Sequence, residues 1–347
     1  MAGLLFLSGC LAPAGPKLAY TPEEIRSELT ARLPERSPDE ILVPFEVSEQ
    51  NLERAQGLVP SYGPPSERIF TLARVLGSET GFGLSYNPAI TESADRVIEL
   101  GRGNCLSLSS VLIGLAREMG LKAYYMDASD RVNEIRGDEN LVVWTGHVTA
   151  AVETADGLKV IDFDGEVSKS RSFDLLDDFQ AIAHFHVSRG YTLIHEARSS
   201  EQPIPWEQVR EAFEVATRIG SDVPSAWNNL GIANARLGNA EVAKEQYRTA
   251  IALQPSLGAA HNNLGILHMR ENDLDVAIEF FSTAAELEPE NPYLAYQLGD
   301  TLRMNGDMER AAEQFHRALA LKPDYQAARD ALAALDLEWT AIDGSGG

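Results

Sequence analysis

The final third of the chain repeats with a period of 34 residues, and this repeat constrains the fold more than any other feature. Pro255, Pro289 and Pro323 mark the period. Alignment on these prolines superposes glycine, alanine and aromatic residues: Gly231, Gly265 and Gly299; Ala243, Ala277 and Ala311; Tyr247, Phe281 and Phe315. Small side chains at a fixed spacing let helices approach closely, and one repeat cannot bury its apolar face alone. The period therefore predicts a stack of helical units that share one continuous core.

This register resembles the tetratricopeptide repeat, a pair of antiparallel helices with small residues where they touch. The resemblance implies an all-α solenoid over residues 224–337, made of three repeats and a closing helix. Residues 199–223 are expected to form a linker helix that packs at the other end of the solenoid. Residues 338–347 are expected to form a flexible tail. The family also implies a concave face that binds a protein or peptide partner.

One position of the repeat carries a side-chain amide in every copy: Asn229, Asn263 and Gln297. In some tetratricopeptide proteins this position resembles an asparagine ladder that grips the backbone of an extended peptide. Side-chain amides donate and accept at once, so they match a peptide unit without reading its sequence. The alternative is that these amides cap or bridge adjacent helices. Both interpretations remain open at this point.

The charge balance excludes several classes of partner. The chain has 29 Lys and Arg against 52 Asp and Glu, a formal net charge of -23. Nucleic acids and anionic membrane surfaces both require clustered positive charge. No apolar run reaches the roughly 18 residues that a membrane-spanning helix needs. We therefore expect no nucleic-acid binding, and nothing in the sequence calls for a cofactor.

The apolar stretch that ends at Cys10 resembles a bacterial lipoprotein signal. Leu7, Ser8 and Gly9 precede the cysteine, and small residues there suit a peptidase cleft. The resemblance implies that residues 1–9 are removed, that Cys10 is lipidated, and that Leu11 directs the protein to the outer membrane, facing the periplasm. The alternative is an apolar N-terminus that packs on the domain. Residues 10–60 are then expected to form a tether with a leading helix that Thr21 caps.

Residues 61–198 are expected to form an α+β domain, because helical segments precede antiparallel strands. Helices are predicted over residues 66–76 and, capped by Thr91, in the segment that ends at Gly101. The segment 121–128 reads as a strand. The segment 147–164 reads as a hairpin with its turn at Asp156-Gly157, a pair that favours a tight turn.

Cys105 follows two glycines, Gly101 and Gly103, at the start of an apolar helix that Gly120 ends. The unpaired N–H groups and the positive end of the helix dipole stabilise a thiolate there. The same N–H groups can stabilise an oxyanion that develops on a carbonyl under attack. The position therefore suits a nucleophile, although a buried cysteine is also common as a small apolar residue.

The hairpin supplies the partners that a nucleophilic thiol needs. If its turn pairs Glu153 with Leu158, His147 lies opposite Asp164 and diagonal to Asp162 on the same face. An imidazole held by a carboxylate can deprotonate a thiol and keep one tautomer. The orienting acid is therefore Asp162 or, as the alternative, Asp164.

These motifs resemble the core of the transglutaminase-like superfamily, part of the papain-like cysteine hydrolases. The resemblance rests on "GNC" at residues 103–105, on "LAREMGL" at the end of the same helix, on His147 at a strand start and on "VIDFD". It implies that Cys105 is the nucleophile, His147 the base and Asp162 the orienting acid. Phe163 follows Asp162 where many members have proline. The implied activity is that of a protease, amidase or acyltransferase acting through an acyl-enzyme.

Other candidate residues support weaker functional interpretations. Asn104 is a candidate oxyanion donor, with a turn-forming role as the alternative. His184 and His186 alternate on a predicted strand, as zinc ligands do, but no third ligand has a recognisable spacing, so no metal site is expected. The competing functions are an envelope adaptor with a degenerate papain-like domain, and a chain in which Cys10 and Cys105 form a disulfide.

Overall fold

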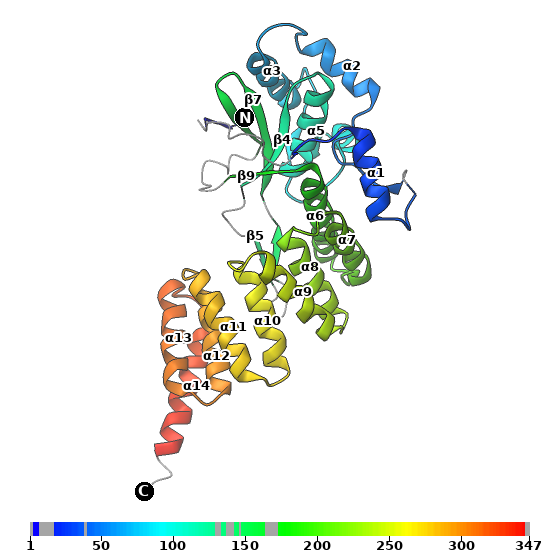
Figure 1. Cartoon of the computed structure of the whole chain (residues 1–347). Coiled ribbons are helices and arrows are strands. Elements are labelled where there is room, and N and C mark those ends of the chain that lie inside the picture. Colours follow the sequence, from blue (N-terminus) through cyan, green and yellow to red (C-terminus); the bar gives the residue numbers. More distant parts are fainter. Residues whose placement is uncertain are drawn as a thin grey trace. The chain divides into compact units, whose positions relative to one another are not determined.

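The computed structural model describes residues 3–6, 17–37, 40–128, 133–136, 142–145, 147–163 and 173–343. By their internal contacts the residues form two compact units. The first comprises residues 1–133 and 145–226, and the second comprises residues 134–144 and 227–347. The first unit mixes helices and strands, and the second consists largely of helices in pairs (Figure 1). The expected order, an α+β domain followed by an all-α repeat array, is confirmed.

Among its described residues, the first unit contains the complete helices α1 (Pro22–Arg32), α2 (Glu49–Leu58), α3 (Pro65–Gly77), α4 (Ala94–Leu100), α5 (Cys105–Glu118), α6 (Asp178–Ser199) and α7 (Trp206–Ile219). Its main sheet has the strand order β1-β8-β7-β4-β9, and every neighbouring pair is antiparallel. The strands are β1 (Gly3–Phe6), β4 (Ala123–Asp127), β7 (Val148–Thr154), β8 (Gly157–Asp162) and β9 (Asp174–Leu176). Two short strands, β2 (Ser85–Tyr86) and β3 (Arg102–Gly103), pair in parallel beside α5.

Helix α5 is the centre of the first core. Every residue from Leu106 to Ala116 is buried, because α3 and α4 cover it and it also packs against β4 and β7. Ser110 bridges α5 to the sheet: its hydroxyl lies 2.8 Å from the hydroxyl of Tyr125 on β4. Gly114 lies where an added Cβ would be 2.1 Å from the carbonyl oxygen of Phe45. The predicted helix from Cys105 is thus confirmed, and it is buried all round rather than on one face.

The described leading residues, 17–37 and 40–60, contribute to this core, which corrects the expectation of a tether for that part of residues 10–60. Helix α1 has the predicted Thr21 cap, completed by a reciprocal bond from the Thr21 amide to Glu24. Ile25 and Leu29 of α1 are fully buried. Helix α2 was not predicted. At the N-terminus, β1 pairs antiparallel with β8, in agreement with the alternative of a packed apolar N-terminus, whereas Cys10 lies outside the described residues.

One further expectation for the first unit is wrong. The segment around His184 is not a strand, because it lies inside α6, a helix of 22 residues that begins at a capping box of Asp177 and Gln180. The helix expected over residues 199–223 is α7, which belongs to the first unit and pairs with α6. Gly190 of α6 allows this approach, since its added Cβ would lie 2.4 Å from the ring of Phe213.

The second unit contains the predicted repeats as three helix pairs and a closing helix (Figure 1). The pairs are α8 (Pro224–Arg236) with α9 (Ala240–Leu253), α10 (Gly258–Arg270) with α11 (Leu274–Leu287), and α12 (Pro292–Met304) with α13 (Met308–Leu321). The first three residues of α8 cluster with the first unit. Helix α14 (Gln326–Asp343) packs against α13 and extends into the residues expected to be a flexible tail. Two short strands, β5 (Asn133–Arg136) and β6 (Val142–Thr145), pair with each other. Residues 134–144 cluster with the second unit.

The aligned glycines and aromatic residues meet within each repeat. A Cβ added to Gly231 would lie 2.5 Å from the ring of Tyr247. In the second and third copies, the glycines approach Phe281 and Phe315 in the same way. The three rings are fully buried. The missing side chain is therefore what lets the paired helices of each repeat pack.

Candidate active site

Cys105 occupies the first position of α5, and the two glycines before it have different structural roles. Gly101 ends α4 in the left-handed conformation, with φ of 68°, where a side chain would be strained. Gly103 has ordinary backbone angles but no room: an added Cβ would lie 3.1 Å from both Ser107 Cβ and Val97 Cγ2. Cys105 is a free, partly exposed cysteine in this structure. The backbone thus presents the thiol at the edge of a buried helix.

Asn104 is the N-cap of α5. Its side-chain oxygen accepts a hydrogen bond from the Ser107 amide at 2.9 Å, and its side-chain nitrogen donates to the Thr91 hydroxyl at 2.8 Å. Its backbone amide donates to the Ile90 carbonyl, also at 2.8 Å. The side-chain oxygen and one hydrogen of the side-chain nitrogen are thus used within the protein. These local bonds agree with the turn-forming alternative, and they make Asn104 the cap of α5.

Thr91 connects this cap to α6. Besides the bond from Asn104, its hydroxyl oxygen lies 3.2 Å from the hydroxyl of Thr192. Glu92, the next residue, donates its amide to the Ser107 hydroxyl at 3.0 Å. Sequence reasoning assigned Thr91 as the cap of the preceding helix, but Ser93 holds that position. The loop containing Thr91 instead links two helices at the entrance to α5.

His147 and Asp162 lie together at one end of the hairpin. His147 directly precedes β7, and Asp162 ends β8; the His147 Nε2 atom lies 3.4 Å from Asp162 Oδ1. Both residues are buried, with 8% and 3% of their surfaces exposed. The backbone carbonyl of His147 accepts a hydrogen bond from Ala128 at 2.8 Å, which ties this residue to the chain that follows β4. The pair is thus anchored on three adjacent segments of the sheet.

The hairpin has the register that the sequence predicts. Glu153 pairs with Leu158, so His147 and Asp162 are diagonal neighbours. The alternative acid, Asp164, lies outside the described residues. Among the described acids, Asp162 is therefore the one that the structure brings to the imidazole.

The two histidines considered as zinc ligands do not form a site. Within α6, residues two positions apart point in different directions, so His184 and His186 cannot share one ion as they would on a strand. Burial lowers the pKa of His184, although Asp127 and Asp222 oppose this shift. Burial, reinforced by Arg189 and Arg36, lowers the pKa of His186 to about 3. Across the described part of the chain, no group of three or more His, Cys, Asp or Glu side chains is arranged to hold a metal.

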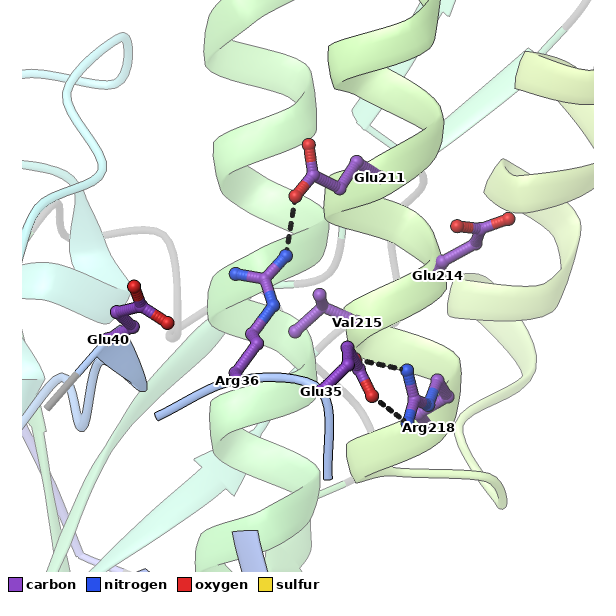
Figure 2. Close-up of a pocket in the computed structure, with 7 residues that line it drawn as sticks. All are labelled: Glu35, Arg36, Glu40, Glu211, Glu214, Val215 and Arg218. Atoms are coloured by element: carbon purple, nitrogen blue, oxygen red, sulfur yellow. Dashed lines mark hydrogen bonds and ion pairs between the residues drawn. The ribbon is translucent and has the colours of Figure 1, made fainter. Parts of the chain in front are cut away.

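A charged pocket between the chain after α1 and helix α7 is held by internal ion pairs (Figure 2). Arg36 contacts Glu211 at 2.6 Å, and Arg218 contacts Glu35 at 2.5 Å and 2.8 Å. These pairs join the leading segment to α7. Because the guanidinium groups already pair with carboxylates of the protein, we interpret this pocket as a structural contact between the leading segment and α7.

The amides predicted to line a peptide groove are buried instead. Asn229 and Asn263 are 0% exposed and Gln297 is 5% exposed. Asn263 donates to the side-chain oxygen of Asn228 at 2.9 Å, which joins α10 to α8 of the preceding repeat. Asn228 in turn donates to Asn229 at 3.1 Å. Asn263 thus bridges adjacent helices, as the alternative expects.

No helix among the described residues combines the length and apolar character required to cross a bilayer.

Comparison with protein families agrees with the two architectures. Residues 53–158 match the model of the transglutaminase-like superfamily. Residues 228–292 and 263–326 match the tetratricopeptide repeat model. No curated protein gives a significant match.

Solved structures with similarity include tetratricopeptide proteins. YrrB, described as "a TPR protein with an unusual peptide-binding site", is 20% identical, with a TM-score of 0.37 over 44% of this chain and 79% of that one. MamA from Desulfovibrio magneticus RS-1 is 17% identical, with a TM-score of 0.40 over 45% of this chain and 84% of that one.

Proposed function

We infer, from a transglutaminase-like domain followed by tetratricopeptide repeats, that this protein is a thiol enzyme that acts on peptide or protein amide carbonyls and holds a partner on its repeats. The thiolate of Cys105 attacks the carbonyl carbon, the amine leaves, and an acyl-enzyme remains. Water or a second amine then releases the acyl group. We take hydrolysis as the default reaction, because water is always present as an acceptor.

The contact between His147 and Asp162 carries this proposal. Nε2 of the imidazole faces the carboxylate, so Nδ1 is the ring nitrogen that takes the thiol proton. After the attack, the same nitrogen returns the proton to the leaving amine. The buried carboxylate stabilises the imidazolium and fixes the orientation of the ring.

The start of α5 supplies the stabilisation of the oxyanion. Helix N-termini have amides without intrahelical acceptors. Asn104 caps the amide of Ser107, which leaves the amides of Cys105 and Leu106 as the donors nearest the sulfur. Aligned N–H groups of this kind stabilise the negative charge that develops on a carbonyl oxygen.

Alkylation of Cys105 by a small electrophile tests the proposed chemistry. With iodoacetamide near neutral pH, His147→Ala is expected to label roughly 10²-fold more slowly than wild type, because the thiol loses its base. His316→Ala is the matched control, since His316 is exposed on α13 in the other unit. Equal rates for wild type and His147→Ala would support the non-catalytic adaptor instead.

We further propose that the protein is anchored in the bacterial cell envelope by lipid on Cys10. The residues Leu7, Ser8 and Gly9 before this cysteine support the proposal. Mass spectrometry of protein extracted from membranes provides the test, because acyl chains on Cys10 add a defined mass. An unmodified Cys10, or a disulfide between Cys10 and Cys105, would contradict it.

A further inference from the structure

A cavity of about 680 Å³ lies in the first unit beside α5. Its walls come from α3, from the segment that contains β2, from α5, and from β8 with the residue after it. Leu76, Leu84, Leu108 and Ile161 are buried apolar residues that line it, and Phe163 contributes a partly buried ring. Ligand pockets typically measure about 300–1,000 Å³ and are mostly apolar. The cavity thus has the size and lining of a pocket for an apolar group.

The lining meets the start of α5 at two places. Leu108 lies one helical turn after Cys105 on the same face of α5. Tyr86, which is 41% exposed, pairs in register with Gly103, two residues before the thiol. Ile161 lines the cavity from β8, whereas the next residue, Asp162, points to the opposite face of that strand. A group bound in this cavity therefore lies beside the start of α5, which carries Cys105.

Arg74 brings positive charge to the cavity. It is exposed on α3, and within the described ranges it has neither an ion pair nor a hydrogen bond. Arg96, another exposed arginine of this unit, is by contrast paired with Glu99 at 2.7 Å. An unpaired guanidinium beside an apolar cavity, in a chain of net charge -23, is positioned to bind the carboxylate of a ligand.

We propose that this cavity is the side-chain pocket for the acyl donor, and that it selects peptides in which a large apolar residue adjoins an acidic residue. The apolar side chain fills the space over Leu108 and Ile161, and the carboxylate pairs with Arg74. The attacked amide then lies over Cys105. This inference rests on the proposed function, and it specifies the substrate class of the same site.

The test uses the full chain and a series of short peptides with a thiol-reactive ketone at the position of the attacked carbonyl. Three peptides differ only in two residues: Phe-Glu, Phe-Gln and Ala-Glu. We expect Phe-Glu to label Cys105 roughly tenfold or more faster than Ala-Glu, because only phenylalanine buries a ring in the cavity. Arg74→Gln is expected to slow Phe-Glu by about tenfold and to leave Phe-Gln and iodoacetamide unchanged. Arg96→Gln, an exposed arginine away from the cavity, is the control.

Two outcomes would overturn the proposal: equal rates for Phe-Glu and Ala-Glu, or equal slowing of Phe-Glu and Phe-Gln by Arg74→Gln. Calorimetric titration of the corresponding peptide amides separates this inference from the chemistry. If His147→Ala leaves iodoacetamide labelling unchanged but the amides still bind in the order Phe-Glu, Phe-Gln, Ala-Glu, the pocket is supported and the enzyme is not. If labelling depends on His147 but the amides bind without that order, the enzyme is supported and the pocket is not.

Discussion

His147 and Asp162 meet across the diagonal of one hairpin, with the imidazole Nε2 3.4 Å from the carboxylate Oδ1 and both side chains buried. The distance is longer than a tight charge-assisted hydrogen bond. The two groups lie on adjacent strands whose pairing is fixed by the turn, so their relation depends on the sheet register. A slip of one residue would turn one of them to the other face.

Removing the negative charge of Asp162 should weaken the proposed base. In Asp162→Asn the imidazole loses the group that stabilises its protonated form, so the rate of thiol alkylation near neutral pH should fall roughly 10²-fold. The pH dependence of that rate should also move toward the profile of a free thiol. Thr149→Val is the control, because Thr149 is buried on the neighbouring strand and its hydroxyl donates to the Ile161 carbonyl at 2.7 Å. An unchanged rate in Asp162→Asn would exclude the pair as part of an activated site.

Loss of the N-cap should destabilise α5 and lower the reactivity of its first residue. Asn104→Ala removes the bonds to Ser107 and Thr91, and should reduce the free energy of unfolding by about 1 kcal/mol. Asn104→Asp keeps an oxygen for the Ser107 amide and should recover most of that loss. Urea denaturation measures the stability and iodoacetamide labelling the thiol. If the alanine and aspartate variants are equally unstable, capping is not the function of Asn104.

Substitution of the repeat glycines by alanine should destabilise the protein to different extents, in an order that the available space predicts. An added Cβ would lie 2.5 Å from a ring atom at Gly231, 2.8 Å at Gly299 and 3.0 Å at Gly265. Each alanine variant should destabilise its repeat by about 1–3 kcal/mol, most strongly at Gly231 and least at Gly265. Hydrogen exchange of the amides in each helix pair reports the local effect. Gly57→Ala is the control, because nothing lies within 4 Å of its added Cβ. The opposite order would contradict the packing argument.

Acid should destabilise the first unit through His186, a partly buried histidine of α6. The pKa of His186 is lowered to about 3, so the folded chain keeps this imidazole neutral while the unfolded chain protonates it below about pH 6.5. The stability it contributes is complete above pH 6.5 and is lost as pH falls, at most about 1.4 kcal/mol per pH unit. His186→Gln should flatten this dependence between pH 6.5 and 4.5, as measured by urea denaturation at fixed pH. Exposed His316→Gln should leave it unchanged, and equal slopes for His186→Gln and wild type would refute the assignment.

The hydrogen bond between Asn263 and Asn228, which joins two repeats, should contribute to the free energy of unfolding. Asn263→Ala leaves the buried oxygen of Asn228 without its bond from Asn263, a loss of about 1–3 kcal/mol. The effect should appear as faster hydrogen exchange in both α8 and α10. If the variant keeps wild-type protection but loses a peptide partner, the groove interpretation is correct instead.

Local patterns predicted most of the helices and the hairpin. Thr21 and Pro22 mark the start of α1, and the register of Glu153 with Leu158 follows from a two-residue turn. The segment containing His184 was mistaken for a strand, because alternating histidines and aromatic residues mimic a period of two. A capping box at Asp177 and Gln180 was the signal that could have identified α6.

The sequence by itself determined the repeat period, the recurrence of a glycine and an aromatic residue in each repeat, and the order of cysteine, histidine and acid along the chain. These properties depend on spacing within one element or between neighbours, where backbone geometry leaves few choices. Only the tertiary structure decided which candidate side chains already have hydrogen-bond partners within the protein. Asn104 bonds to Thr91, and Asn263 bonds to Asn228 of another repeat. The sequence does not identify these hydrogen-bond partners, because they are distant along the chain or are one of several polar residues that could serve. A buried polar group bonds to the partner that packing brings within reach, so the tertiary structure decides which one it is.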